Sequence, residues 1–83
     1  MKKKIAILGS TGSIGKSTIS IISQDKKNFD VILLSTNKNL VEISKQYKKF
    51  KPKFLIITDY KSYIKFKKLN NNKNLKIFNN YNK

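Results

Sequence analysis

Arginine, histidine, cysteine and tryptophan are all absent from this 83-residue chain, and each absence excludes some chemistry. Without cysteine and histidine the chain forms no disulfide, has no thiolate nucleophile or imidazole base, and lacks the ligands of most zinc sites. Without arginine it lacks the forked side chain that most often reads guanine and grips phosphate. A dedicated nucleic-acid-binding protein usually has some arginine, so a small basic nucleic-acid-binding module is kept only as the alternative hypothesis.

Long apolar runs are absent as well. The first residues, MKKKIAILGS, imitate a secretory signal, but the apolar run from Ile5 to Leu8 is cut off by Gly9. This run is too short for the apolar core of a signal peptide. No other run approaches the roughly 20 apolar residues of a membrane span. We therefore expect a cytoplasmic protein with no membrane partner.

Charge of one sign dominates, because 19 cationic residues, all lysine, stand against 4 acidic ones and give a formal net charge of +15. Such a field attracts any polyanion and does not choose among nucleic acid, membrane and phosphorylated small molecules. The lysines occur in short clusters all along the chain, together with many asparagines and isoleucines. This even distribution is typical of a genome-wide compositional bias.

Four short apolar runs, rich in β-branched residues, predict β-strands. They are Ile5 to Leu8, Val31 to Leu34, Phe54 to Ile57 and the shorter Leu75 to Phe78. The first three have no alternating polar face, which is expected of strands covered on both sides in a parallel sheet.

The segments between the runs have helical spacing. In the first segment we expect Ile14, Ile21 and Ile22 to share one face, and in the second Leu40, Ile43, Tyr47 and Phe50. Asn39 and Glu42 resemble a capping box before the second helix, and Pro52 ends it. Asp59 is the expected cap of a third helix with Tyr63, Ile64 and Phe66.

Strands and helices that alternate in this way give a βαβαβαβ order with right-handed crossovers. The predicted fold class is therefore α/β, a partial Rossmann-type doubly wound parallel sheet in a single truncated domain. We assign residues 1–78 to this domain. Residues 79–83 are expected to form a frayed polar tail, and the asparagine-rich stretch 70–74 a loop.

The stretch GSTGSIGKST, which begins at Gly9, allows two hypotheses that differ in the ligand it binds. A nucleotide triphosphatase loop needs a glycine five residues before the glycine that precedes lysine, but that position is Ser10. The extra residue changes the curvature of a loop whose consecutive N–H groups must surround a phosphate. The triphosphatase reading is therefore disfavoured.

The second reading is the first turn of a dinucleotide-binding fold. Gly9 makes the tight exit from the strand, Gly12 lets the backbone approach a pyrophosphate, and Gly15 allows close packing of the helix. The N–H groups of Thr11 to Ile14 would then face the phosphates, assisted by the helix dipole. The alternative is that this stretch is a glycine-rich turn that binds no ligand.

The end of the second apolar run indicates which dinucleotide would bind. An NAD-binding fold usually has Asp or Glu here for the ribose 2′-hydroxyl, but the sequence reads Ser35-Thr36-Asn37-Lys38-Asn39. A carboxylate would repel a 2′-phosphate, whereas hydroxyls, an amide and an ammonium group can hold it. The pattern favours NADP(H), and the alternative interpretation is that Lys38 is one more solvated lysine.

These residues closely resemble the start of the 1-deoxy-D-xylulose 5-phosphate reductoisomerase family, NADPH-dependent enzymes of the non-mevalonate isoprenoid pathway. The stretches that resemble it are IAILGSTGSIGKSTISII, FDVILLSTNKNLVEISKQ and FKPKFLIITD. The resemblance runs from about Lys3 to Asp59. Its most specific parts are GSTGSIGxST, from Gly9 to Thr18, and the pair Lys38 and Asn39.

The resemblance implies a cofactor-binding site for NADPH in which Thr11 to Ile14 form the loop and Lys38 and Asn39 lie at the 2′-phosphate and ribose. The family usually has glycine at position 37, and this chain has Asn37. If that position requires positive φ, asparagine is the next most tolerant residue, and weaker binding is expected. The full expected set is Gly9, Thr11, Gly12, Ser13, Ile14, Gly15, Asn37, Lys38 and Asn39.

The resemblance also implies what the intact enzyme does. A metal-assisted rearrangement of 1-deoxy-D-xylulose 5-phosphate is followed by hydride transfer from NADPH, giving 2-C-methyl-D-erythritol 4-phosphate. Acidic residues hold Mg²⁺ or Mn²⁺, the substrate is a phosphorylated sugar, and the full-length protein is a homodimer.

The four acidic residues of this chain, Asp25, Asp30, Glu42 and Asp59, are scattered and unlike a metal cluster. We therefore expect neither catalytic residues nor metal ligands here. The chain is interpreted as the amino-terminal part of an oxidoreductase, from a fragment or a truncated gene. The catalytic and carboxy-terminal domains are expected to be absent, so that the piece is inactive alone.

Overall fold

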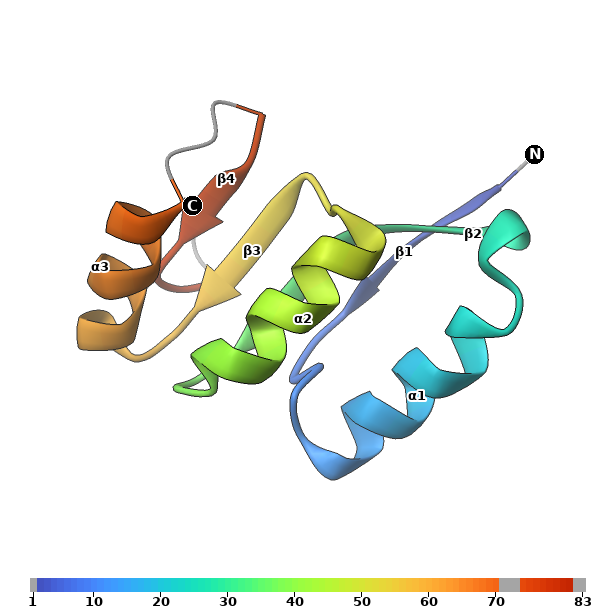
Figure 1. Cartoon of the computed structure of the whole chain (residues 1–83), viewed down its shortest axis with the longest axis horizontal. Coiled ribbons are helices and arrows are strands. Elements are labelled where there is room, and N and C mark those ends of the chain that lie inside the picture. Colours follow the sequence, from blue (N-terminus) through green and yellow to red (C-terminus); the bar gives the residue numbers. More distant parts are fainter. Residues whose placement is uncertain (1, 71–73, 82–83) are drawn as a thin grey trace.

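The computed structural model describes residues 2–70 and 74–81, in which strands and helices alternate (Figure 1). The strands are β1 (Lys3–Ile7), β2 (Phe29–Thr36), β3 (Phe54–Ile57) and β4 (Lys76–Phe78). The helices are α1 (Ser13–Ser23), α2 (Leu40–Phe50) and α3 (Tyr60–Leu69), with one 3₁₀ turn, η1 (Lys26–Asn28), before β2.

The four strands form one parallel sheet in the order β1-β2-β3-β4. Ile7 pairs with Leu34, Ser35 with Ile56, and Leu55 with Ile77, so the carboxyl ends of the strands lie along one edge. Between the pairs Ile5–Val31 and Ala6–Leu33 the register shifts, so that Ile32 of β2 is an extra residue in an otherwise regular ladder. The predicted α/β class with a parallel Rossmann-like sheet is confirmed.

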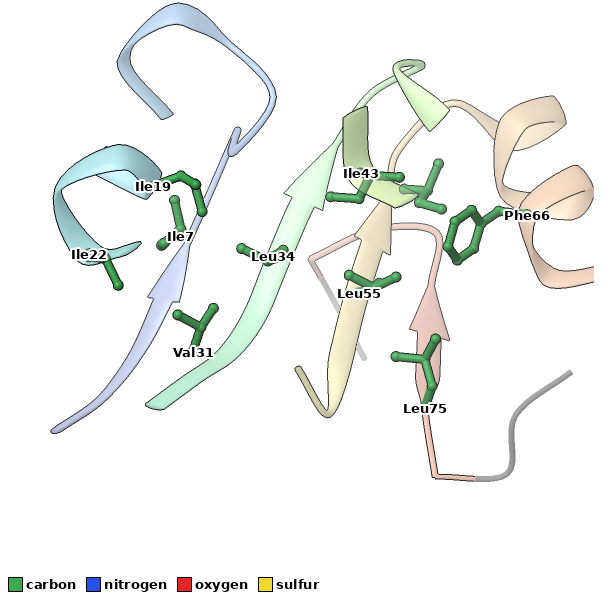
Figure 2. Packing of buried hydrophobic residues seen from close by; sticks show 10 residues of the cluster. Ile7, Ile19, Ile22, Val31, Leu34, Ile43, Leu55, Phe66 and Leu75 are labelled. Carbon is green, nitrogen blue, oxygen red and sulfur yellow. The ribbon is translucent and has the colours of Figure 1, made fainter. Parts of the chain in front are cut away.

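The core lies on one face of the sheet. Because each strand is added beside the previous one in the same direction, right-handed crossovers place all three helices on that face. Figure 2 shows that side chains from the three helices and from the strands meet in one cluster. The buried hydrophobic members are Ile7, Ile19, Ile22, Val31, Leu34, Ile43, Leu55, Ile57, Phe66 and Leu75.

In the described residues the three helices lie on one face of the sheet, as in one half of a doubly wound fold. The opposite face carries the side chains that alternate with the core positions. Leu33, Phe54 and Phe78 are partly buried there, whereas Ser35 and Ile56 are buried. The rings of Phe54 and Phe78 stack there with centroids 6.2 Å apart. An apolar run therefore indicated a buried strand correctly, but not which layer covers each side.

Helix α1 buries a different face from the one expected. Ile14 and Ile21 are 84% and 69% exposed, whereas Ile19 and Ile22 are buried with Gly15. The reason is the helical period, since positions 15, 19 and 22 are spaced by four and three residues and share one face. Among the three isoleucines predicted to be core residues of α1, Ile22 is correct, and Ile14 and Ile21 are wrong.

The expected limits of α2 and α3 are confirmed. The side chain of Asn39 accepts a hydrogen bond from the Glu42 N–H at 3.1 Å, which caps α2, and Asp59 accepts one from the Ser62 N–H at 3.1 Å, which caps α3. Helix α2 ends at Phe50, and Lys51 follows in the left-handed conformation with φ 48° just before Pro52. The helix therefore ends where the proline ring forbids it to continue.

The stretch after β4, expected to be frayed, returns to the sheet. The Asn79 amide donates to the carbonyl groups of Ile57 and Thr58 at 3.0 and 3.2 Å. The Tyr81 hydroxyl donates to Ser35 Oγ at 3.0 Å. Residues 71–73 of the predicted loop and residues 82–83 of the predicted tail lie outside the described residues. Each of the described helices is too short or too polar to cross a bilayer.

Candidate functional site

The turn between β1 and α1 is shaped by two of its three glycines. Gly9 has φ +66°, a left-handed conformation that other residues adopt at a cost. Gly15 is buried at the start of α1, and a Cβ atom there would lie 2.6 Å from the Ser10 Cα. Glycine at these two positions therefore lets the chain leave the strand sharply and lets the helix pack directly on the turn.

Gly12 is different, because nothing in the described chain requires glycine there. Its backbone is extended, with φ −77° and ψ 173°, which suits any residue. A Cβ atom on Gly12 would meet only the Gly9 carbonyl oxygen, at an ordinary contact distance of 3.4 Å. The space that a side chain would occupy is open to solvent, so the backbone is accessible to a molecule from outside.

Free N–H groups surround Gly12. Among the described residues, the main-chain N–H groups of Thr11, Ser13, Ile14 and Gly15 have no hydrogen-bond partner. The Gly12 N–H does have one, since it donates to the Gly9 carbonyl at 3.0 Å. The first turn of α1 contains no acidic residue and Gly12 has no capping side chain, so the positive end of the helix is open to an anion.

Hydroxyl groups fasten this turn to the end of β2. The Gly9 N–H donates to Ser35 Oγ at 2.7 Å, and the Ser10 N–H donates to the Ser35 carbonyl at 2.9 Å. The hydroxyl groups of Thr11 and Thr36 are hydrogen-bonded at 2.6 Å. Ser35 and Thr36 are buried, so these bonds are partly shielded from water.

A residue that the sequence analysis did not single out, Gln46 of α2, also holds the turn. Its Nε2 donates to the Ser10 carbonyl at 2.8 Å and more weakly to Glu42 Oε2 at 3.3 Å. The side chain is only 3% exposed. A glutamine among the core-facing positions of α2 was the available signal, but a polar residue does not enter an apolar periodicity.

Asn37, Lys38 and Asn39 lie immediately after Thr36, at the same edge of the sheet as the glycine turn. All three are exposed, and the Lys38 carbonyl accepts a hydrogen bond from the Leu40 N–H at 2.8 Å. Asn39 uses its side-chain oxygen as the cap of α2. Because the turn and this segment meet through Thr11 and Thr36, one ligand at this edge can reach both.

Asn37 does not need the backbone freedom of glycine. Within residues 2–70 and 74–81, Lys51 is the one non-glycine residue with positive φ, so Asn37 has negative φ. Its amide donates to Thr58 Oγ1 at 2.7 Å, which joins the segment to the end of β3. Weaker cofactor binding is expected only if position 37 requires positive φ. Asn37 does not have positive φ, so this reason for weaker binding does not apply.

Asp59 lies near Lys38, although the two residues are far apart in the sequence. Hydrogen bonds from the Ser62 hydroxyl, at 2.7 Å, and from the Ser62 N–H lower the pKa of Asp59 below its usual value, and the charges of Lys38 and Lys61 lower this pKa further. Asp59 is thus an anion at neutral pH. Its carboxylate accepts hydrogen bonds from Ser62 at the α3 cap, and it forms none with Lys38.

An open hollow of about 500 Å³ lies against the glycine turn and is lined by Ile7, Leu8, Gly9, Gly12, Ser13, Ile14, Gly15 and Thr18. A larger hollow of about 580 Å³ lies at the opposite edge, where β3 and β4 begin. The turn is the better candidate because free N–H donors, an open glycine and a helix N-terminus converge there. No group of three Asp or Glu side chains suited to a metal ion occurs within the described residues.

A family model described as 1-deoxy-D-xylulose 5-phosphate reductoisomerase matches residues 5–82. The reductoisomerase of that name from Pelagibacter ubique is 52% identical over 79 residues, covering 95% of this chain and 20% of that protein. The one from Proteus mirabilis is 43% identical over 67 residues, covering 81% of this chain and 17% of that protein. The chain therefore spans about a fifth of the length of the curated relatives it matches.

A solved structure shows the same fold at 28% identity. The reductoisomerase from Zymomonas mobilis, described as a complex with NADPH, superposes with a TM-score of 0.83 over 94% of this chain and 21% of that one. The nucleic-acid-binding module considered from the sequence is supported by none of these comparisons.

Proposed function

This chain belongs to the 1-deoxy-D-xylulose 5-phosphate reductoisomerase family, and we propose that it binds the adenosine and pyrophosphate end of NADPH. One observation above all supports the proposal. Four free N–H groups, those of Thr11, Ser13, Ile14 and Gly15, surround a glycine whose side-chain space is empty. Main-chain donors at the positive end of a helix bind anionic phosphate without requiring a charged side chain.

The residues present fit this cofactor. A pyrophosphate needs several donors at close approach, and Gly12 offers backbone that no Cβ atom shields. Thr11, Ser13 and Ile14 would supply the N–H donors on the phosphate side, and Gly9 and Gly15 would hold the turn that presents them. When bound, NADPH supplies a hydride, while this chain's own residues bind and orient its nonreacting end.

Preference for NADPH over NADH is assigned to the segment after β2. Lys38 is exposed there, and Asn37 and Asn39 add amide groups beside it. The α2 cap uses only the side-chain oxygen of Asn39, and the side-chain amide donor has no partner among residues 2–70 and 74–81. An ammonium group and amides suit a 2′-phosphate dianion, whereas the carboxylate that usually marks an NAD site does not occur in this segment.

The relatives are about five times as long as this chain. For a full-length protein that contains this chain, we propose the activity for which the relatives are named. That activity is rearrangement and NADPH-dependent reduction of 1-deoxy-D-xylulose 5-phosphate, assisted by Mg²⁺ or Mn²⁺, in a cytoplasmic homodimer. The metal ligands, the sugar-phosphate contacts and the catalytic residues are assigned to parts outside the shared fifth. Residues 1–78 are proposed to belong to the cofactor domain, and Asn79 and Tyr81 add hydrogen bonds to its sheet.

The proposal is tested by the change Gly12→Ala. Its added methyl group fits the ligand-free chain, so the midpoint of thermal unfolding should change little. It would stand where a pyrophosphate must approach, so the affinity for NADPH should fall by roughly tenfold or more. Calorimetric titration with NADPH measures the affinity, and circular dichroism on heating measures the stability.

Ser20→Ala is the matched control, because Ser20 is exposed on α1 and distant from the turn along the helix. This variant should bind NADPH as the unchanged chain does. Equal affinities for Gly12→Ala and the unchanged chain would contradict the proposed site. Absence of NADPH binding by the unchanged, folded chain would contradict the proposed function.

A further inference from the structure

The contact between Gln46 and the glycine turn leaves one polar atom of the Gln46 side chain buried without a partner among the described residues. Gln46 Oε1 is buried and has no hydrogen-bond partner among the described residues. A buried acceptor without a partner loses its hydrogen bonds to water and destabilises the fold. A methionine or leucine would avoid that cost at a position where α2 faces the rest of the molecule. A glutamine at this position therefore indicates that its Nε2 donor serves a purpose other than packing.

We propose that Gln46 is a positioning residue for the cofactor, an inference that rests on the proposed NADPH binding. Its Nε2 donates to the Ser10 carbonyl at 2.8 Å. The carbonyl of Ser10 and the N–H of Thr11 belong to one peptide group, which is planar and trans. In such a group the two bonds point in opposite directions, so drawing the carbonyl towards α2 turns the Thr11 N–H away from it.

The orientation of the Gln46 amide follows from its partners. Both partners, the Ser10 carbonyl and Glu42 Oε2, are acceptors, so only the Nε2 end can face them. A reversed amide would place Oε1 against two other oxygens. Glu42 thus holds the donor end in place, at 3.3 Å, while the stronger bond fixes the peptide group of the turn.

No other described contact fixes this peptide group directly. Ser10 is held through its N–H and hydroxyl, both on the Ser35 carbonyl, and Thr11 through its hydroxyl on Thr36. These bonds leave the Ser10 carbonyl to Gln46 alone. Loss of Gln46 would therefore free the Thr11 N–H to rotate, while the rest of the turn stays attached to β2.

The first test is Gln46→Met, compared with Gln24→Met at the other glutamine of the chain, which is exposed at the end of α1. Gln46→Met removes the unpaired Oε1 but leaves the Ser10 carbonyl without its donor, so the two effects on stability oppose each other. We expect a nearly unchanged unfolding midpoint and an affinity for NADP⁺ lower by roughly tenfold. Gln24→Met should change neither.

The second test, Gln46→Glu, gives a readout that a purely structural role would not produce. Burial and the nearby carboxylate of Glu42 would raise the pKa of the introduced carboxyl group. When ionised, this group repels the Ser10 carbonyl, and when protonated it donates to that carbonyl as Nε2 does. The ratio of unchanged to variant affinity for NADP⁺ should therefore shrink as the pH falls, and the ratio cancels titration of the cofactor itself.

The outcomes separate the two claims. If the unchanged chain binds NADP⁺ and Gln46→Met binds it equally, the positioning role is overturned and the proposed function stands. If the unchanged, folded chain binds neither NADP⁺ nor NADPH, the proposed function fails, and the positioning role fails with it. Unfolding of both Gln46 variants would also overturn the inference, because the contact would then serve stability.

Discussion

At the scale of single residues, the three glycines show that one residue type answers three different physical needs. Gly9 supplies a positive φ, and Gly15 removes a clash with the Ser10 backbone. Gly12 meets neither need, because its conformation is ordinary and its surroundings are open. No contact among the described residues requires glycine at position 12, and this supports the proposed approach of a pyrophosphate to the turn.

Lys38 provides a test of specificity at the same scale. Changing Lys38→Glu replaces an ammonium group by a carboxylate that repels a 2′-phosphate. We expect the affinity for NADPH to fall by about tenfold to a hundredfold and the affinity for NADH to change little. Competitive titrations with the two nucleotides measure both affinities.

Lys65→Glu is the control for Lys38→Glu, because it changes the net charge equally at an exposed position of α3. It should lower both affinities slightly, through the general field alone. Equal affinity of the unchanged chain for NADPH and NADH would count against a 2′-phosphate site at Lys38.

The sequence predicts the glycine turn well because its glycines, its strand and its helix are contiguous. It does not predict how the turn is held. Ser35 and Gln46 contact the turn from about 26 and 36 residues away, and a polar residue in a core-facing position looks the same in a sequence whether or not it has a partner. The assignment of Thr11 to Ile14 and Lys38 as cofactor contacts stays a prediction.

At the scale of elements, helix ends are predicted better than helix faces. Caps and stops depend on one or two residues, such as Asn39 and Pro52, whose effect on the backbone is local. The buried face of α1 depends on which side meets the sheet, and five isoleucine and threonine residues over nine positions leave several choices. Gly15 was the better guide, since a glycine that must be close to its neighbour faces inward.

The end of α2 yields a stability prediction. Lys51 has φ 48°, and a residue with a Cβ atom pays about 1 kcal/mol in this conformation. The change Lys51→Gly should therefore raise the free energy of unfolding by about 1 kcal/mol, as at other glycine-terminated helices. Urea titration followed by circular dichroism measures the change.

Lys53→Gly is the comparison, because Lys53 has no positive φ and gains nothing from glycine. It should leave stability unchanged or lower it, since glycine makes the unfolded chain more flexible. A lower unfolding free energy for Lys51→Gly would show that the left-handed conformation at residue 51 is not retained in solution.

At the scale of the whole molecule, a chain of 83 residues with one helical layer has little core. A domain of this size buries only about 60–65% of the surface that its unfolded chain exposes. The hydrogen bonds that join β1, β2 and β3 at their carboxyl ends therefore matter for stability as well as for the site. The Thr36 carbonyl accepts from the Thr58 N–H at 3.0 Å, and the Asn37 carbonyl accepts from the Asp59 N–H at 3.2 Å.

For the isolated 83-residue chain we expect no reductoisomerase turnover. Its acidic side chains do not gather into a metal-holding group within the described residues, and the chain spans a fifth of its relatives. The assay is the oxidation of NADPH in the presence of 1-deoxy-D-xylulose 5-phosphate and Mn²⁺. The full-length reductoisomerase of Pelagibacter ubique serves as the positive control. Measurable consumption by the isolated chain would contradict this expectation.

The order of the strands affects how the chain can fold while it is being synthesised. The contacts that fasten the glycine turn through Ser35, Thr36 and Gln46 all lie within the first 46 residues. A nascent chain that has emerged from the ribosome to that point already holds every partner in this network except Tyr81. Each later strand then pairs with the exposed edge of the strand before it. The glycine turn can therefore form during translation, before the later strands have been synthesised.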